Sequence, residues 1–358
     1  MIRRIPVTKA WSGHPVRFQL VTTSDKQYVA FYNRNRVLTV GERVLGREPH
    51  WQLKAFPGEA LGWDSHNNIA MTMYDGHLHL ACNMHSSPLR YYRTTSPGEI
   101  RTMEPAQMLG CQENRTTYPR FHKTATGDLV FTYRDGIAGR GYTIANRWDG
   151  EKWVRIGTIF GSDGFSCYYN ENNSHFAYCW RAPGGPRFNT LVCYAYSWDF
   201  QRWEGGLEDV KPPITVANSD IVDPVPYNGG MLNGNVVAGW DIEGNPVVTY
   251  HKFDADGNTQ IYNARLEGTK WVQYQMTDWN FRWDFDGKGT INRKVNVHPL
   301  MDEYQGKWKV DMNMEIVGRD ERKKAPVWRL EHKRGPANND RPVDNPMEPQ
   351  MLYVVGED

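Results

Sequence analysis

The sequence has few cysteines, no excess of either charge and no long apolar run. Its 42 lysine and arginine residues are balanced by 41 aspartate and glutamate residues. A nucleic-acid-binding protein needs a positively charged surface, so we expect no nucleic-acid partner. No stretch of about 18 apolar residues occurs, so we expect no membrane-spanning helix and no membrane partner. The first residues also lack the apolar run of a signal peptide.

The five cysteines do not indicate a disulfide framework. They are Cys82, Cys111, Cys167, Cys179 and Cys193, an odd number with no C-x-x-C pair. Most are expected to be small buried residues of strands. A structural zinc site of Cys167, His175 and Cys179 stays open as a minor alternative, because ligand spacing alone is a weak signal.

The common catalytic fingerprints are also missing. The sequence contains no serine-hydrolase elbow, P-loop, zinc-protease helix or dinucleotide motif, so those mechanisms have no support. No pair of carboxylates stands out from the many turn aspartates. Ordinary glycoside hydrolysis by two carboxylates therefore stays open without a named pair.

Aromatic residues and turn residues are abundant. The chain has 14 Trp, 19 Tyr and 13 Phe, which is enough for a sizeable core. Short apolar or alternating segments repeatedly follow turns of Asp, Asn and Gly, as in hairpins. No stretch of more than about ten residues has helical spacing of its apolar positions. We therefore predict an all-β fold with few and short helices.

The turns recur at regular intervals. Taking Asp25, Gly76, Gly127, Asn173, Gly244 and Gly306 as landmarks gives intervals of 51, 51, 46, 71 and 62 residues. Four-stranded propeller blades have roughly 40 to 50 residues. We predict a seven-bladed β-propeller that forms a single domain over residues 1–358. The apolar segment 351–355 is predicted to join the first blade and close the ring.

A second recurring element is a turn that ends in tryptophan. It occurs at residues 148–153, 197–203 and 266–271. A large ring fills the widening wedge between neighbouring blades, so we predict that these tryptophans pack between blades.

Histidines concentrate in one part of the chain. His66 precedes an expected strand, and His85 follows the neighbouring one. Both imidazoles are expected near the same end of these strands, where propeller loops converge on a central depression. His77 and His79 alternate within one strand, and we expect them to pack or to face solvent.

Arginines and tyrosines near strand ends are candidate contacts for an acidic carbohydrate. Arginine pairs bidentately with a carboxylate, and tyrosine offers a ring face and a hydroxyl. The candidates include Tyr118, Arg134 and Arg181, and either Tyr194 or Tyr196. For each residue alone, blade packing or a structural ion pair is the favoured interpretation.

Seven short motifs follow one another between about residues 63 and 283. They are Asp-Ser-His-Asn at 64–67, Asp-Gly-His-Leu-His at 75–79, Asn-Met-His at 83–85, Tyr-Pro-Arg-Phe at 118–121, Tyr-Arg-Asp-Gly at 133–136, Asn-Arg-Trp-Asp at 146–149 and the segment 251–265. Together they resemble the BNR-repeat propeller family that includes ulvan lyases and rhamnose-glucuronate lyases. Their order and spacing are more specific than any single motif.

This resemblance implies a fold and a reaction. The relatives are seven-bladed propellers, and the lyases among them cleave the bond at C4 of a rhamnose-linked uronic acid by β-elimination. His66 matches the family's base and Tyr133 its proton donor. His85, Arg147 and Tyr194 match positions that bind the substrate and its carboxylate, and Arg181 is a further candidate contact. No cofactor is required for such a reaction, because arginine and imidazole can stabilise the intermediate.

The resemblance also implies a partner and a location. The partner is an acidic polysaccharide or oligosaccharide that contains rhamnose and uronic acid, such as ulvan or a rhamnosyl-glucuronate glycan. We expect a secreted or periplasmic monomer whose signal peptide has been removed. Two other functions stay open: an α-L-rhamnosidase-type hydrolase that acts on rhamnose-α-1,4-glucuronate, and a non-catalytic carbohydrate-binding propeller.

Overall fold

The computed structural model of the chain describes residues 2–13, 16–62, 64–241, 243–285, 291, 293–299, 309–310, 316–317, 328–332 and 349–357. Within these residues the regular structure is almost entirely β, which confirms the predicted all-β class. The helices are three short 3₁₀ turns, η1 (Ile100–Thr102), η2 (Pro186–Phe188) and η3 (Val216–Asn218). No helix of the described residues is long and apolar enough to cross a membrane.

Three four-stranded antiparallel sheets and one eight-stranded sheet follow one another along the chain. The eight-stranded sheet consists of two antiparallel groups of four strands joined only by a parallel bridge between Gly141 and Ser166, so we describe five successive four-stranded groups and call each a sheet. The first contains β2 (Gln19–Thr22), β3 (Lys26–Tyr32), β4 (Val37–Val44) and β5 (Gln52–Ala60), and the second contains β6 (Ala70–Tyr74), β7 (His77–Ala81), β8 (Tyr91–Thr94) and β9 (Met103–Pro105). The third contains β10 (Thr116–Lys123), β11 (Leu129–Ile137), β12 (Arg140–Trp148) and β13 (Trp153–Phe160). The fourth contains β14 (Ser166–Asn172), β15 (His175–Arg181), β16 (Asn189–Tyr196) and β17 (Asp220–Asp223), and the fifth contains β18 (Val236–Trp240), β19 (Pro246–Phe253), β20 (Thr259–Glu267) and β21 (Lys270–Gln275).

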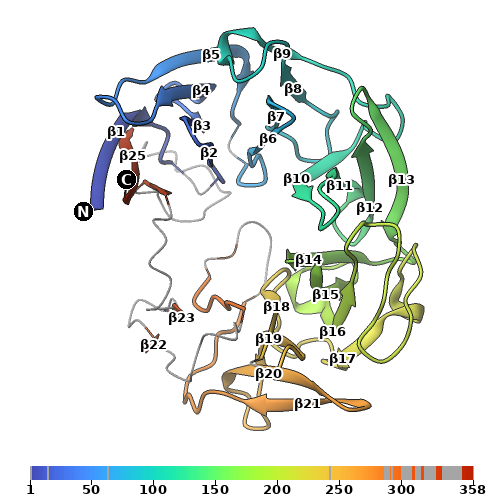
Figure 1. Cartoon of the computed structure of the whole chain (residues 1–358). Helices are drawn as coiled ribbons and strands as arrows, with labels where there is room; N and C mark the ends of the chain where they lie inside the picture. Colours follow the sequence, from blue (N-terminus) through green and yellow to red (C-terminus); the bar gives the residue numbers. More distant parts are fainter. Residues whose placement is uncertain are drawn as a thin grey trace.

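The sheets are arranged around a central space, with the first strand of each sheet nearest the centre (Figure 1). Neighbouring sheets are joined by a short connection from the outer strand of one to the inner strand of the next. This radial order is propeller-like. It places the inner strands β2, β6, β10, β14 and β18 around one shared centre.

Both ends of the chain lie in one further sheet. β1 (Ile2–Ala10) pairs antiparallel with β25 (Gln350–Glu357), which also pairs with β24 (Arg329–Glu331). The apolar segment 351–355 therefore lies beside β1. A short hairpin is formed by β22 (Lys309–Val310) and β23 (Ile316–Val317). The landmark Gly306 and residue 63 of the predicted motif region lie outside the described residues.

The other five landmarks occupy one structural position. Asp25, Gly76, Gly127, Asn173 and Gly244 all lie in the turn between the first and second strands of their sheets. Gly76, Gly127 and Gly244 have φ values of 75°, 89° and 81° there. Glycine adopts a positive φ without steric cost, which explains the choice of residue. The interval between landmarks is thus the length of one sheet with its connections.

Tryptophans fill the space between neighbouring sheets, as predicted. Trp153 of the third sheet packs against Tyr91 of the second, with ring centres 5.9 Å apart. Trp203 packs against Phe160 of the preceding sheet at 6.0 Å. Trp271 packs against Tyr194, again of the preceding sheet, at 5.4 Å. All three tryptophans are buried.

Candidate active site

His66 lies in the connection that leads from the first sheet into β6. The Asp64 carboxylate accepts a hydrogen bond from the backbone N–H of His66 at 2.9 Å and lies 2.5 Å from its ring Nδ1. An aspartate that bonds the backbone two residues later forms an Asx turn. The Asn68 side chain accepts the backbone N–H of Arg17 at 2.7 Å, which ties this connection to the first sheet. The local sequence therefore fixes the direction of the imidazole.

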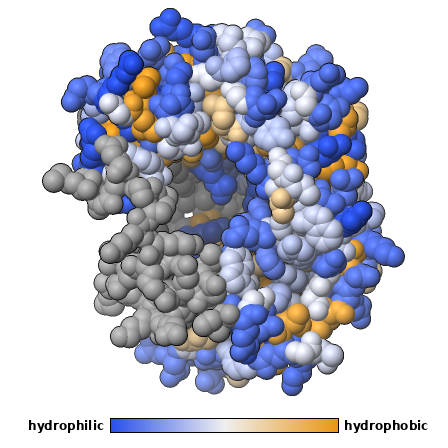
Figure 2. Space-filling view, in the orientation of Figure 1, coloured by the Kyte–Doolittle hydropathy of each residue, from blue (hydrophilic) through white to orange (hydrophobic). Residues whose placement is uncertain are grey.

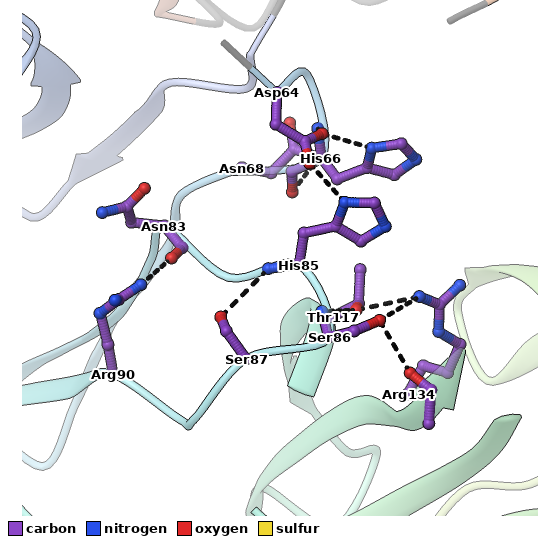
Figure 3. Close-up of polar contacts among 11 residues, drawn as sticks. Asp64, His66, Asn68, Asn83, His85, Ser86, Ser87, Arg90, Thr117 and Arg134 are labelled. Carbon is purple, nitrogen blue, oxygen red and sulfur yellow. Dashed lines mark hydrogen bonds and ion pairs between the residues drawn. The ribbon is translucent and has the colours of Figure 1, made fainter. Parts of the chain in front are cut away.

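His85 lies in the connection after β7 and shares the same carboxylate. Its Nδ1 bonds the second oxygen of Asp64, and its ring stacks on that of His66 with centres 4.0 Å apart. Figure 3 shows both rings extending to the same side of Asp64. A ring whose Nδ1–H faces a carboxylate keeps its lone pair on Nε2. The arrangement therefore presents two Nε2 atoms that can accept a proton.

Hydrogen bonds from His66 and His85 keep the Asp64 carboxylate ionised. Burial raises its pKa, but hydrogen bonds from His66 and His85 outweigh this and hold the pKa well below its usual range. The side chains of all three residues remain about a quarter to a third exposed, at 34%, 26% and 35% for Asp64, His66 and His85. The Asp64 carboxylate is thus ionised, and the cluster is accessible to a ligand.

The connection that carries His85 is fastened to the third sheet (Figure 3). The backbone N–H of Ser86 donates to the Thr117 hydroxyl at 2.8 Å, and the Ser86 hydroxyl donates to the Gly136 carbonyl at 3.0 Å. Arg134 donates to the Thr117 hydroxyl at 3.0 Å and to the Ser86 hydroxyl at 3.4 Å. One hydrogen-bond network therefore positions His85 and Arg134 relative to each other.

Tyr118 reaches the histidines through a β-bulge. The register of β10 against β11 shifts between Thr117 and Arg120, so Tyr118 and Pro119 oppose a single residue. Tyr118 has a φ of 57°, a left-handed conformation that is strained for a bulky side chain. Bulges turn side chains away from the regular sheet and are common near active sites. The Tyr118 ring lies 5.7 Å from the His66 ring.

One arginine lies over the Tyr118 ring and a second lies behind its neighbour Tyr168. The guanidinium of Arg134 lies over the Tyr118 ring, and that of Arg181 lies 5.9 Å from the ring of Tyr168, which packs edge-on against Tyr118. Burial raises the pKa of Tyr118 well above its ordinary value, and the two arginines only partly offset this. The phenol therefore keeps its proton at neutral pH beside two fixed positive charges.

Tyr133 points elsewhere, although it directly precedes Arg134 in β11. Successive side chains of a strand point to opposite faces, so Arg134 and Tyr133 cannot both face the histidines. Tyr133 is 1% exposed and packs in the core between the second and third sheets. Its hydroxyl accepts a hydrogen bond from Arg155 at 3.1 Å, and burial raises its pKa to about 12.

Arg147 and Tyr194 lie at the other end of their sheets, near the first turns. Arg147 pairs with Val130 in register and forms an ion pair with Asp128 at 3.6 Å, beside the Gly127 turn. The Tyr194 hydroxyl bonds the Nδ1 of His175 at 2.5 Å, near the Asn173 turn. Of the residues predicted for the site, the structure brings His66 and His85 together, and Arg181 lies at the same end of the sheets, over the Tyr168 ring. Tyr133, Arg147 and Tyr194 are not among them, because the sheet register directs them elsewhere.

The only metal-ligating group of three in the described part of the chain is Asp64, His66 and His85, whose ligand atoms lie within 4.8 Å of one another. Such a group is able to hold an ion. Cys167, His175 and Cys179 do not form a group there, because His175 and Cys179 occupy opposite halves of β15. All five cysteines are free thiols.

The site borders a hollow at the centre of the molecule. Tyr118 lines a cavity of about 290 Å³ together with residues of the inner strands β2, β6 and β14. Figure 2 shows a hollow near the middle of the molecule in the orientation of Figure 1. The histidines, Tyr118, Arg134 and Arg181 lie at the end of the sheets opposite the landmark turns, which we call the site face.

Comparisons with known proteins give a family and a fold. A model of the family described as "BNR repeat-containing family member" matches residues 26–279. A comparison with curated proteins found no match. Among solved structures, the polysaccharide lyase Uly1 is similar with a TM-score of 0.64 and 13% identity over 99% of this chain and 98% of that one. A PL25 ulvan lyase bound to -[GlcA(1-4)Rha3S]- is similar with a TM-score of 0.56 and 15% identity over 78% and 76%. At these identities the likeness concerns the fold.

Proposed function

This chain belongs to the BNR repeat-containing family, and we propose that it is a polysaccharide lyase that cleaves a rhamnose–uronic acid linkage by β-elimination at C4 of the uronate. One observation supports this most strongly: two imidazoles held by one carboxylate face a protonated tyrosine and a nearly buried arginine. These groups are a base, an acid and a carboxylate partner, which are the three that the elimination needs.

Arg134 would bind the uronate carboxylate. The residue is 5% exposed, so its charge acts in a medium of low polarity, where it is worth more than in water. Arg181 supplies a second positive charge on the far side of the Tyr168 ring. Neutralising the carboxylate stabilises the negative charge that develops at C5, which makes the C5 proton easier to remove.

His66 would remove the C5 proton through its Nε2. The electron pair of the C5–H bond then forms the C4=C5 double bond, and the C4–O bond to the preceding sugar breaks. Asp64 holds the imidazole in the tautomer that can accept this proton and stabilises the imidazolium that forms. His85, held by the same carboxylate, would bind the substrate from the neighbouring position.

Tyr118 would give its proton to the leaving oxygen. Its raised pKa keeps the proton in place until the C4–O bond breaks, and the resulting alkoxide is a stronger base than a phenolate. Proton exchange with water then restores Tyr118 and His66. In this scheme, no bond-making step requires a cofactor.

A rhamnosidase-type hydrolase and a binding module are the alternatives. The test is ultraviolet absorbance during incubation with ulvan and with rhamnosyl-glucuronate-capped arabinogalactan, because only elimination yields a conjugated unsaturated uronate. We expect a rise with wild type that His66→Ala abolishes. Free rhamnose without such a rise would replace the lyase by a hydrolase, and binding without any product would leave a lectin-like module.

The architecture and location of the protein are also proposed. Five four-stranded sheets and the sheet that joins both ends of the chain support a single ring. The remaining length at the two ends suits two further sheets, so we propose seven blades closed by segment 351–355. A polymeric substrate favours a secreted or periplasmic enzyme that acts as a monomer. An experimental structure would count the blades, and sedimentation would test the monomer.

A further inference from the structure

An open hollow lies between the third and fourth sheets at the end that carries the landmark turns, which we call the far face. It has a volume of about 590 Å³ and is lined by Lys123, Thr124, Ala125, Glu171, Asn172, Asn173, Ser174 and Tyr196. These residues belong to the end of β10 and the turn after it, to the end of β14 and the turn after it, and to the last position of β16. The hollow therefore lies opposite the histidines, and the mechanism proposed above does not use it.

A row of partly exposed rings begins beside this hollow and reaches the fifth sheet. Trp198 packs against Tyr196 with ring centres 5.9 Å apart, and Tyr196 packs against His175 at 4.9 Å. His175 packs in turn against Trp240, the last residue of β18, at 5.6 Å. His175 and Tyr196 are paired in register, so their side chains share one side of the fourth sheet. All four rings are partly exposed, and we call them the aromatic row.

Trp198 departs from the packing of the other turn tryptophans. Trp153, Trp203 and Trp271 are buried between neighbouring sheets. Trp198 belongs to the same turn as Trp203 but is left partly exposed. Leaving apolar ring surface in water forgoes the stabilisation that burial provides, and contiguous exposed rings are typical of binding surfaces. The aromatic row is therefore better explained by a ligand than by the packing of the sheets.

Backbone hydrogen bonds hold Trp198 and the hollow in one arrangement. The Ala125 N–H donates to the Trp198 carbonyl at 3.1 Å, which joins the third sheet to the fourth. The Ser197 N–H donates to the Ser174 carbonyl at 2.9 Å, and the Ser174 N–H donates to the Glu171 carboxylate at 2.8 Å. A ligand therefore meets a surface that needs little ordering on binding, which favours affinity.

The hollow offers polar groups that the protein itself does not use. In the part of the chain that the structure describes, the Lys123 ammonium and the Asn173 amide form no hydrogen bond or ion pair, and both residues are exposed. Glu171, the acidic residue of the lining, is already engaged by the His122 ring at 3.3 Å and by the Ser174 N–H. An unpaired ammonium beside a free amide suits an anionic group with neighbouring hydroxyls.

The two features together match a sugar chain. A pyranose ring has a face of C–H groups that packs on aromatic rings, and its hydroxyls hydrogen-bond amides. The aromatic row alone would suit any apolar partner. The polar hollow that adjoins it at Tyr196 favours a ligand rich in hydroxyls instead.

We propose that the far face carries a second carbohydrate-binding site, in which the aromatic row stacks against sugar rings and Lys123 binds an anionic group of the same chain. The site rests on the proposed function only for the choice of glycan. Because it lies away from the histidines, it binds without cleaving. Two separate sites on one protein raise the affinity for a polymer that reaches both.

Affinity electrophoresis in gels that contain ulvan measures binding to the intact polymer. The parent protein carries His66→Ala, so that the polymer is not degraded. We expect Trp198→Ala and Lys123→Gln each to weaken ulvan binding about tenfold, the loss typical of one stacking or charge-assisted contact. Trp198→Phe should retain most of the affinity, because it keeps a ring. Lys270→Gln removes the same charge from an exposed position of the fifth sheet and should bind like the parent.

Desulfated ulvan identifies the anionic group that Lys123 binds. A carboxylate is retained in this polymer, so Lys123→Gln should then weaken binding as it does with native ulvan. If the group is a sulfate, the parent should bind desulfated ulvan more weakly, and Lys123→Gln should have no further effect.

A short fragment separates the far face from the site face. Wild type and Trp198→Ala, both with His66 in place, should cleave an ulvan tetrasaccharide at the same rate, because the fragment occupies the site face alone. Parental ulvan affinity in Trp198→Ala and Lys123→Gln overturns the second site and leaves the lyase proposal intact. Equal losses of ulvan binding and tetrasaccharide cleavage also overturn it, because the changes would then act on the site face or the fold. Weakened ulvan binding in these variants, with no cleavage by wild type, supports the second site and overturns the lyase.

Discussion

The guanidinium carbon of Arg134 lies 5.0 Å from the centre of the Tyr118 ring. The two residues come from neighbouring strands, and only the bulge at Tyr118 allows the ring to lie under the guanidinium. A uronate carboxylate bound to Arg134 would lie close to the Tyr118 hydroxyl. In the proposed mechanism this relationship favours Tyr118 over Tyr133 as the proton donor, and the two tyrosines provide a matched comparison.

Tyr118→Phe should abolish most of the lyase activity while Tyr133→Phe should not. The first change removes the proposed donor, for which a loss of about 10² to 10⁴ in kcat is expected. The second removes a hydroxyl that accepts a hydrogen bond from Arg155 within the core, so kcat should stay within a few fold. Initial rates of unsaturated-uronate formation measure both. The opposite ranking would return the role to Tyr133.

The arginines allow a similar comparison. Arg134→Ala should lower kcat/KM by more than about a hundredfold, because it removes the charge that stabilises the developing carbanion. Arg147→Ala removes an ion pair with Asp128 at the other end of the sheet and should leave kcat/KM nearly unchanged. Steady-state kinetics on one uronate polymer compare kcat/KM of the two variants. Equal losses would contradict the assignment.

A glycine tests whether the position of Arg134 matters as well as its charge. A Cβ on Gly141 would lie 2.7 Å from both Cγ and Cδ of Arg134. Gly141→Ala should therefore displace the guanidinium and lower kcat about tenfold or more, with the arginine still present. Gly58→Ala in β5 is the matched control, because no atom lies within 4 Å of its added Cβ and its φ is not positive. Unchanged kinetics in Gly141→Ala would show that Arg134 has room to adapt.

The sequence was sufficient for the fold because its turns are chemically distinct. Asp25 and Asn173 mark the same turn as Gly76 and Gly127, since all of them tolerate or favour tight hairpin geometry. Their spacing therefore reports the length of a sheet directly. The number of blades is harder to predict from the sequence, because the connections vary in length. The last landmark, Gly306, also lies outside the described residues.

The site was only partly predictable, because a strand has two faces. Tyr118 and Tyr133 both precede an arginine-containing segment, and motif order alone does not say which one faces the histidines. Pro119 within β10 was the available signal, since proline inside a strand is typical of a bulge. Asp64 carried a similar signal as an Asx-turn residue before His66. The cross-strand register that separates Arg134 from Arg147 is a tertiary property.

Asp64→Asn should reduce kcat strongly without preventing folding. An amide can no longer accept two Nδ1–H groups as a carboxylate does, so the imidazoles lose their fixed tautomer. We expect a loss of about 10² or more in kcat, with a smaller effect on KM. Nitrogen NMR of the histidines gives an independent readout, in which both rings should become tautomer mixtures. Unaltered histidine signals would mean that Asp64 does not position them.

Chelation tests whether Asp64, His66 and His85 bind a metal ion. If Asp64 serves the two histidines by hydrogen bonding, dialysis against a strong chelator should leave activity unchanged. A loss that zinc or another transition ion restores would instead assign a metal to Asp64, His66 and His85, whose ligand atoms are close enough to hold one. Metal analysis of the purified protein completes the measurement.

The stability of the fold should fall between pH 7 and pH 5, because buried histidines must stay neutral in it. Burial lowers the pKa of His79 and of His251 to about 3. His79 is fully buried, with its Nδ1 bonded to the Tyr91 hydroxyl at 2.7 Å and its ring edge-on to Trp148. The unfolded chain titrates near the ordinary value of about 6.5, so below this pH the unfolded state binds a proton that the folded state refuses.

Replacement of His79 by phenylalanine isolates this effect. Each such histidine should remove roughly 2 kcal/mol of unfolding free energy on going from pH 7 to pH 5, and the contribution is fully present only above the unfolded-state value. His79→Phe keeps a ring among Trp148 and Trp153 but cannot titrate, so its stability should fall by that much less over the interval. Urea unfolding at the two pH values gives the difference. His50→Gln, at an exposed position, is the control and should match wild type. Parallel pH dependences of His79→Phe and wild type would mean that His79 accepts a proton in the folded state, which a ring enclosed by tryptophans does not permit without opening the contact between the second and third sheets.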